Sequence, residues 1–291
     1  MDLVVQTPHW PSPGETVTGS GFMTVPGGKG ANQAIAAARL GGEVRMLARV
    51  GADAFGRQLL ENLSAAGVQC DDVRVVDGVA SGVAVITVCD GENEIVLDPG
   101  ANHSLTPDDV REFEPHIRDA EMLLVQLEVP LPVVTAAIEL AQSVGTPVLL
   151  NPAPALALDH DLLSRVTVLT PNEGEAALLA GLSREDASAE ELLDVLQSYG
   201  VQTVCITQGA RGITYRHGGL ETEQRSAVSV EVVDTTAAGD VFSGALAVAL
   251  TEGALFDDAA AFAQNAAAIA VTRAGATPSI PTRAEVESFH A

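Results

Sequence analysis

The sequence is poor in basic residues, and in lysine above all. Its 291 residues include fifteen basic residues against 39 acidic ones, which gives a formal net charge of −24 at pH 7, and Lys29 is the single lysine. Binding to nucleic acid requires a basic surface that displaces the counterions of the phosphates, and the sequence offers no basic stripe. An anionic membrane surface is disfavoured for the same reason. We therefore expect neither nucleic acid nor a membrane as a partner.

Cysteines and long apolar runs are also scarce. The three cysteines are Cys70, Cys89 and Cys205. Their number is odd and no pair has the spacing of a CxxC motif, which favours buried free thiols in a reducing compartment. No stretch has the roughly eighteen uninterrupted apolar residues of a membrane-spanning helix. Met1 is followed by Asp2 and a short apolar run, without the basic start of a secretion signal. These features predict a soluble, cytoplasmic protein.

The chain does contain a regular alternation of strand-like and helix-like segments. Hydrophobic residues make up 47% of it and charged residues 19%, which indicates an ordinary globular interior. From about Glu43, apolar runs bounded by Gly, Pro and Asn alternate with helical patterns of ten to fifteen residues. This rhythm is typical of βαβ units. We predict an α/β fold: a doubly wound, mostly parallel central sheet flanked by helices, in a single domain over residues 1–291.

Two segments depart from this rhythm. They cover approximately residues 2–25 and 72–100, where apolar and polar residues alternate without a helical pattern. Turn dipeptides occur at Asp77-Gly78 and Asp90-Gly91. The alternation predicts a small, separate antiparallel sheet.

The stretch "GGKGAN" places Lys29 between glycines at the start of an alanine-rich helix. The glycines permit close backbone approach, so Lys29 and Asn32 could bind a polar ligand rich in hydroxyl groups. A tight turn with a solvated lysine explains the same pattern. The stretch is neither a Walker A loop nor GxGxxG, and the missing GxGxxG disfavours a dehydrogenase.

The stretch "VDTTAAGDVFSGAL" combines small residues with an acidic residue at the start of a helix. Ala237, Ala238 and Gly239 are expected to leave backbone N–H groups free, which favours an anion or a developing negative charge. Asp240 follows in the first turn, where it could accept a proton from an attacking hydroxyl group during phosphoryl transfer. Alternatively, the carboxylate only complements the helix dipole.

Further candidates follow predicted strands. In "TPNEGEA", Asn172 and Glu175 could face the carboxyl edge of the sheet, with Glu175 near a hydrated magnesium ion, although simple helix capping explains both. "ITQGARG" suits close packing against a nucleotide, and a hairpin entry is the alternative. The loop "VTRAGATPSIP", together with Asp234, could chelate a monovalent cation through carbonyl oxygens.

Nine motifs occur together in one order, and this combination resembles the ribokinase (PfkB-type) family of carbohydrate kinases. The resemblance runs from Asp2 to the last predicted helix. The motifs are "PSPGETVTG", "GGKGANQA", "VGADAFG", "LVQLEVP", "LNPAPA", "TPNEGEA", "ITQGARG", "VDTTAAGDVFSGAL" and "VTRAGATPSIP".

The resemblance implies ATP-dependent phosphorylation of D-ribose at its 5-hydroxyl, which yields ribose 5-phosphate and ADP. A kinase for another pentose, for fructose or for a nucleoside remains an alternative, since sugar choice depends on few side chains. A weakly active sugar- or nucleotide-binding protein is a second alternative.

The resemblance also implies roles for particular residues. Asp240 would be the general base. The backbone anion hole would be formed by Ala237, Ala238 and Gly239. The sugar would contact Asp2, Gly28, Lys29, Asn32, Glu128 and Asp240. ATP and Mg²⁺ would lie near Asn172, Glu175, Thr207 and Gly209. A potassium ion would be held, mostly through backbone carbonyls, by Asp234, Thr236, Ala270, Arg273, Gly275 and Ser279.

The family resemblance extends to the small sheet, which would cover the sugar as a lid and join two subunits into a homodimer. Family members also have a strand before the position of Asp2, and an asparagine that contacts the sugar. Neither is found in this sequence, so we expect Asp2 on a fraying terminus, an unfilled sheet position and a weakened sugar affinity.

Overall fold

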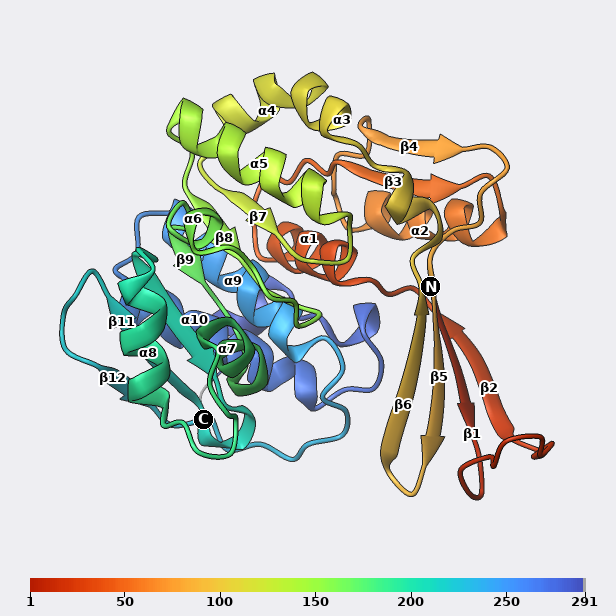
Figure 1. Ribbon diagram of the computed structural model, residues 1–291. Helices are drawn as coiled ribbons and strands as arrows, with labels where there is room; N and C mark the ends of the chain where they lie inside the picture. The colour runs from red at the N-terminus through yellow and green to blue at the C-terminus, as the bar shows by residue number, and fades with distance from the viewer. Residues whose placement is uncertain (290–291) are drawn as a thin grey trace.

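The computed structural model describes residues 1–289, so the last two residues of the expected single domain lie outside the described residues. The chain forms a body of sheet and helices from which a smaller sheet projects (Figure 1). The N-terminus lies where the two parts join.

A six-stranded sheet forms the centre of the body, in the order β12-β11-β10-β9-β8-β7. Its first four strands along the chain pair in parallel, and the last two add an antiparallel edge. The strands are β7 (Leu123–Val125), β8 (Val148–Leu150), β9 (Val168–Leu169), β10 (Thr203–Thr207), β11 (Ile213–His217) and β12 (Glu223–Arg225). The predicted mostly parallel sheet is confirmed.

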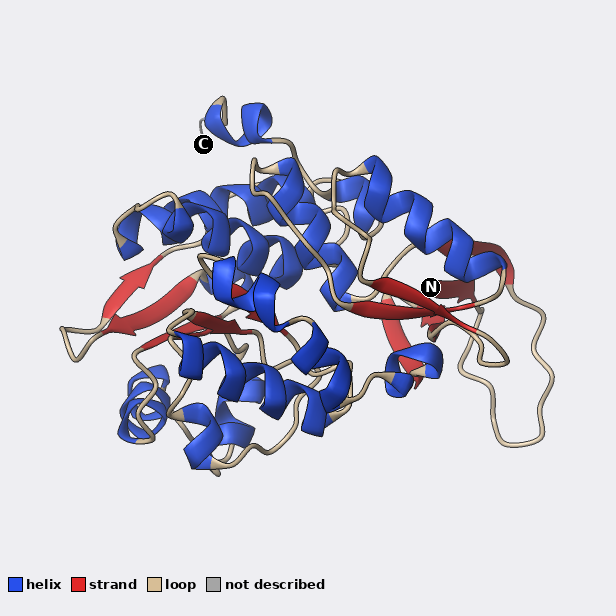
Figure 2. Cartoon of the chain, turned by 90° about the horizontal axis from the view of Figure 1, so that it is seen from above, coloured by secondary structure: helices blue, strands red, loops and turns tan. Residues whose placement is uncertain are grey.

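Helices cover both faces of this sheet, as Figure 2 shows. Successive residues of β8 point to opposite faces: Leu149 belongs to one apolar cluster, and Val148 and Leu150 to the other. The first cluster includes α1 (Lys29–Arg39), α9 (Ala238–Thr251) and α10 (Phe256–Val271). The second includes α3 (Pro107–Glu112), α4 (Glu114–Asp119), α5 (Leu131–Val144), α6 (His160–Leu163), α7 (Glu173–Ala180) and α8 (Ala189–Ser198). The doubly wound arrangement is therefore confirmed.

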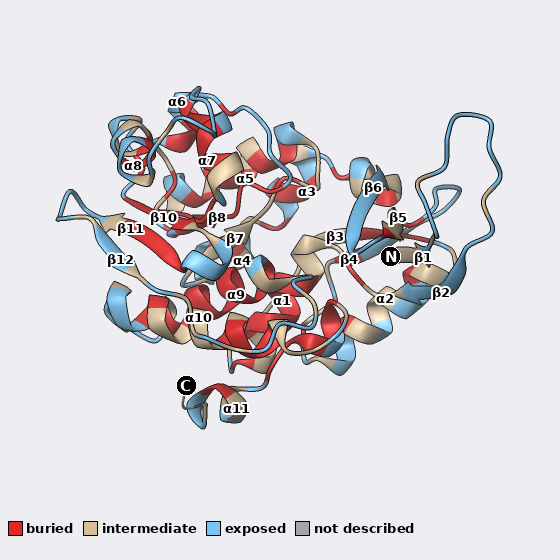
Figure 3. Cartoon of the chain, turned by 90° about the horizontal axis from the view of Figure 1, so that it is seen from below, coloured by how far each residue is buried: buried red, intermediate tan, exposed pale blue. Residues whose placement is uncertain are grey.

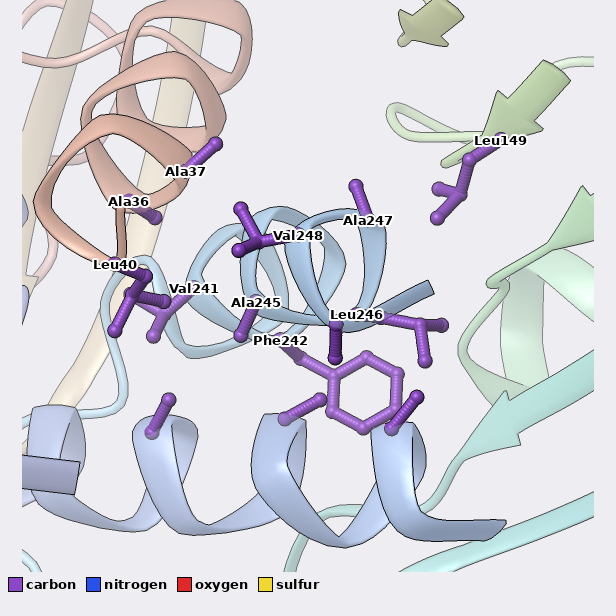
Figure 4. Close-up of a cluster of buried hydrophobic side chains, with 14 of the residues drawn as sticks. Ala36, Ala37, Leu40, Leu149, Val241, Phe242, Ala245, Leu246, Ala247 and Val248 are labelled. Atoms are coloured by element: carbon purple, nitrogen blue, oxygen red, sulfur yellow. The ribbon is translucent and has the colours of Figure 1, made fainter. Parts of the chain in front are cut away.

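Helix α9 is the central helix of the first layer. Nearly all of its residues are apolar or small, and ten of its fourteen residues are buried. Figure 4 shows its side chains Val241, Phe242 and Leu246 among those of the neighbouring helices. The helix is thus enclosed from Asp240 onward, whereas Ala238 and Gly239 at its start are not buried.

The small sheet has the order β2-β1-β5-β6, and we call these four strands the lid. They are β1 (Asp2–Gln6), β2 (Ser20–Val25), β5 (Val83–Cys89) and β6 (Glu92–Asp98). The small sheet was expected to be antiparallel throughout, but β1 pairs in parallel with β5, while the other two pairings of the sheet are antiparallel. The lid projects from the body, and much of it is exposed (Figure 3).

Asp2 does not lie on a frayed end. It pairs with Val25 on one side and with Ala84 on the other. The amino group of Met1 donates a hydrogen bond of 2.9 Å to the Gly82 carbonyl oxygen, and Met1 itself is buried. Pairing on both sides fixes the position of Asp2 in the lid.

Two further strands lie outside both sheets. β3 (Ala48–Gly51) and β4 (Val73–Val76) pair in parallel as a two-stranded sheet, with α2 (Ala54–Ala65) as their connection. β4 falls inside the range 72–100 expected for the lid, yet it pairs with β3, so the second lid segment begins at Val83. The remaining short elements are η1 (Gly100–Ser104), η2 (Gly209–Arg211), η3 (Thr277–Ser279) and α11 (Arg283–Glu287).

The cysteines are free, as expected, but only two of the three are buried. Cys89, the last residue of β5, and Cys205, within β10, are buried, whereas Cys70 is half-buried. None of the helices in residues 1–289 combines the length and the apolar composition needed to cross a membrane.

Candidate active site

The candidate site lies where α1 and α9 begin. The two helices touch closely at Gly244, where a Cβ atom would come within 2.7 Å of the Gln33 carbonyl oxygen. This contact brings the Asp240 carboxylate onto α1. The Asn32 Nδ2 group donates a hydrogen bond of 3.0 Å to Oδ2 of Asp240, and Gln33 Nε2 donates one of 3.0 Å to Oδ1. Asp240 is only 6% exposed, so its carboxylate is held in one orientation.

The glycines before Lys29 make room for acidic groups. A Cβ atom on Gly27 would lie 2.3 Å from Oδ2 of Asp2, so only glycine fits beside that carboxylate. Gly28 has a φ of 97°, which favours glycine. The Lys29 amide then donates a hydrogen bond of 2.8 Å to Oε2 of Glu128. The "GGKG" turn therefore places carboxylates of the lid and of the body around one lysine.

Burial dominates the electrostatics of this cluster. It raises the pKa of Asp240, of Glu128, of Asp2 and of Glu175 above their ordinary values. The charge of Lys29 acts against this rise at all four carboxyl groups. Lys29 is thus a shared counterion of four acidic groups, and at Asp2 the Met1 amino group opposes the rise more strongly still.

The N-terminus of α9 is open to a ligand. Ala237 caps it in the left-handed conformation, with a φ of 61°, and a Cβ atom on Gly239 would meet nothing within 4 Å. The amides of Ala237 and Gly239 donate no hydrogen bond to any group in residues 1–289. The Ala238 amide differs from expectation, because it donates a hydrogen bond of 3.2 Å to the Thr235 carbonyl oxygen. Two of the three expected amides therefore remain free for an anion.

The candidates for the nucleotide lie together at the carboxyl ends of β9 and β10. Asn172 and Glu175 form a capping box on α7: Oδ1 of Asn172 accepts from the Glu175 amide at 2.9 Å, and Oε2 of Glu175 accepts from the Asn172 amide at 2.8 Å. The capping interpretation is thus correct. Thr207 forms a bridge with Asn172, and Gly209 begins the turn that follows β10. The Oε1 atom of Glu175 has no partner in the described chain.

A hydrated magnesium ion fits this edge better than a metal held by protein alone. No group of three or more His, Cys, Asp or Glu side chains in residues 1–289 could hold a metal ion. Magnesium usually binds one or two carboxylates, several waters and the phosphates of a nucleotide. Glu175 presents one such carboxylate oxygen at this edge.

Three of the six residues expected at a monovalent cation are in contact: Asp234, Thr236 and Gly275. Oδ2 of Asp234 accepts a hydrogen bond of 2.8 Å from the Gly275 amide, which ties the two loops to each other. Oδ1 of Asp234 accepts from the amide and the hydroxyl group of Thr236, at 2.9 and 2.6 Å. The other three expected residues, in the loop after α10 and at its end, are Ala270, Arg273 and Ser279. Adjacent loops rich in carbonyl oxygens suit an oxygen-ligated ion.

Three functional candidates escape sequence reasoning: Gln33, Gln126 and Asn151. Gln33 is fully buried and touches Asp240, and the other two touch Gln33. Each is part of a motif noted above, "GANQA", "LVQLE" and "LNPAPA", and two of them directly follow strands. A polar residue directly after a buried strand is the pattern that could have identified Gln126 and Asn151.

The chain is similar in sequence and fold to known carbohydrate kinases. Residues 1–283 match the model of the pfkB family carbohydrate kinases. The chain is 42% identical to the ribokinase of Haemophilus influenzae over 99% of its own length and 94% of the relative's. It is 44% identical to the ribokinase of Schizosaccharomyces pombe, over 98% and 93%. A solved structure of Arabidopsis thaliana ribokinase, complexed with ribose and ATP, superposes with a TM-score of 0.90 at 32% identity and covers 99% of this chain and 96% of that one.

Proposed function

The chain belongs to the pfkB family of carbohydrate kinases, and from this premise we propose that it phosphorylates D-ribose at the 5-hydroxyl with ATP. One observation supports this most directly. The buried Asp240 carboxylate lies at the open N-terminus of α9, and it is held there by amides of α1 next to Lys29. A base and free backbone N–H groups at one point are what phosphoryl transfer to an alcohol requires.

In the proposed reaction, the 5-oxygen of ribose forms a bond to the γ-phosphorus of ATP while the bond from that phosphorus to the β,γ-bridging oxygen breaks. The hydroxyl proton passes to Asp240. The free amides of Ala237 and Gly239 donate to the transferring phosphoryl group, whose negative charge the positive end of the α9 dipole also stabilises.

The sugar-binding side of the proposed site uses the cluster around Lys29. Its ammonium group and the amide of Asn32 donate hydrogen bonds to sugar hydroxyls, and the carboxylates of Asp2 and Glu128 accept them. Gly28 leaves space for the sugar ring. Since Asp2 belongs to β1 of the lid, lid and body would contact the same sugar and exclude water from it.

Two ions complete the proposal. Glu175 and Asn172 would hold hydrated magnesium on the phosphates, and Thr207 and Gly209 would lie along the nucleotide. The 234–236 and 270–279 loops would hold a potassium ion. Magnesium neutralises phosphate charge, and potassium would strengthen the field at the N-terminus of α9. ATP and both ions are abundant in the cytoplasm, where we place the enzyme.

A sugar panel tests the proposed function. The purified protein is incubated with ATP, magnesium, potassium and one candidate acceptor at a time, and ADP release is followed. We expect the highest kcat/KM with D-ribose, and lower values with 2-deoxyribose, fructose and nucleosides. A preference for another acceptor would reassign the substrate. Binding of ribose without ADP release would indicate a sugar-binding protein instead.

The lid supports a proposed homodimer. Phe22 and Val96 are 68% and 70% exposed, and both lie in edge strands whose outer backbone groups are unpaired in the described sheet. We expect the double variant Phe22→Glu/Val96→Glu to convert a dimer into a monomer, as measured by light scattering. Val75→Glu is the matched control, because Val75 is 53% exposed but lies in β4 outside the lid. A monomeric wild type would rule the dimer out.

A further inference from the structure

A chain of buried amides lies directly beneath Asp240. Gln33 is fully buried and uses its whole amide group. Its Nε2 group donates to Oδ1 of Asp240 and to Oδ1 of Asn151, both at 3.0 Å. Its Oε1 atom accepts a hydrogen bond of 2.6 Å from Gln126. At the far end, Asn151 Nδ2 donates a hydrogen bond of 2.9 Å to the carbonyl oxygen of Thr170.

The direction of this chain is set by a backbone group. An amide side chain can turn over and exchange its donor for its acceptor, but a backbone carbonyl oxygen can only accept. Thr170 therefore forces Asn151 to present its NH₂ group to the Thr170 carbonyl oxygen and its own oxygen to Gln33. Gln33 must then present NH₂ to that oxygen, and the same NH₂ group reaches Asp240. Gln126 can turn over to suit Gln33, because its own Oε1 has no hydrogen-bond partner among residues 1–289.

From this geometry we infer that Asn151 and Gln33 are positioning residues: Asn151 fixes the amide of Gln33 so that Asp240 always faces a donor. The inference rests on the proposed role of Asp240 as the base. A carboxylate buried to this extent needs donors in order to stay ionised and ready to accept a proton. Asn32 supplies one donor from the sugar side, and the chain from Thr170 supplies the other from the protein interior.

The charged groups around Asp240 do not alter this argument. Lys29 faces it from α1, Asp2 from the lid, Glu128 from the segment after β7 and Glu175 from α7. None of them is one of the hydrogen-bonded amide side chains, so these charges stay in place when Gln33 or Asn151 is substituted. Burial raises the pKa of Asp240, and the bonds from Asn32 and Gln33 lower it. Loss of a donor must therefore raise this pKa further.

The pH dependence of kcat in the presence of saturating ribose and ATP tests the inference. Gln33→Met should move the acid limb of the kcat–pH profile upward by about one pH unit, because it removes a donor from the ionised carboxylate. Asn151→Leu should move it in the same direction by no more than that, because it only frees the Gln33 amide to turn over. Activity should recover to within a few-fold of wild type at high pH, and the ribose KM should change little. The double variant should show no larger shift than Gln33→Met alone, since Asn151 acts only through Gln33.

Ser243→Ala is the matched control. Ser243 is buried, and its hydroxyl group lies 3.1 Å from that of Thr170, but it makes no bond to the amide chain. This variant should lower the melting temperature and leave the acid limb in place. If Asn151→Leu does not fold, Gln33→Met alone decides the question. An unmoved acid limb in Gln33→Met, or additive shifts in the double variant, would overturn the inference. A different result would show that the proposed role of Asp240 is wrong: the Asp240→Asn variant would keep its turnover.

Discussion

Asp240→Asn should lower kcat for ribose phosphorylation by about 10³-fold, within the range of 10² to 10⁴ typical of a general base. The amide keeps the size of the side chain but cannot accept the hydroxyl proton. Ribose and ATP should still bind, because Lys29, Asn32 and the α9 N-terminus are unchanged. Steady-state kinetics and calorimetric titration of both ligands measure the two effects. Raising the pH should not restore turnover in this variant, because it has no group at position 240 to ionise.

Asp109→Asn is the matched control, because it makes the same Asp-to-Asn substitution at a buried position outside the site. Asp109 is also buried, but it forms an ion pair with Arg49 between α3 and β3, outside the site. Breaking a buried ion pair costs stability, so this variant should melt at a lower temperature. Its kcat should stay within about twofold of wild type, as expected for a change that leaves the transition state untouched. Turnover of Asp240→Asn within tenfold of wild type would refute the proposed base.

Local patterns made much of the fold and part of the site predictable. The capping box joins residues only three apart, Asn172 and Glu175, so the sequence alone indicates it. Alternating strand and helix patterns predict a parallel sheet, and the carboxyl ends of its strands then bring separate motifs to one edge. The position of Asp240 in the first turn of α9 follows from the small residues before it.

Long-range pairing was not predictable in the same way. Gln33 and Asp240 are 207 positions apart, and nothing local in "GANQA" shows that Gln33 reaches Asp240 as Asn32 does. Alternation in residues 72–100 indicates strands but not their partners, so β4 was assigned to the lid although it pairs with β3. The left-handed Ala237 is a conformation that alanine seldom adopts, and it accompanies the turn in which the Ala238 amide bonds to Thr235.

Lys29 is the compensating positive charge for an acidic cluster in an acidic protein. The chain contains 39 acidic residues, yet the cluster of Asp2, Glu128, Glu175 and Asp240 has a single compensating side chain among them. Without that charge, each of these carboxyl groups would bind a proton more readily. A base must be ionised to act, so the lysine matters for chemistry as well as for sugar binding.

Lys29→Met should therefore lower kcat/KM for ribose by about 10²-fold, the size expected from losing one or two hydrogen bonds from a charged donor. The ribose KM should rise and the acid limb of kcat should move to higher pH, because the pKa of Asp240 rises further when the positive charge is removed. The KM for ATP should change little. Lys29→Arg keeps the charge but not the compact ammonium group, so its acid limb should stay while its kcat/KM falls.

Arg57→Met provides the charge-matched control, since Arg57 is exposed on α2 and its loss changes the net charge by the same amount. Kinetic constants of this variant should equal those of the wild type. If the acid limb of Lys29→Met stays where it is in wild type, the shared-counterion argument fails even though the lysine could still bind the sugar. If Arg57→Met moves the limb as far as Lys29→Met does, the effect belongs to the net charge of the molecule, because a field spread over the surface does not depend on which cation is removed.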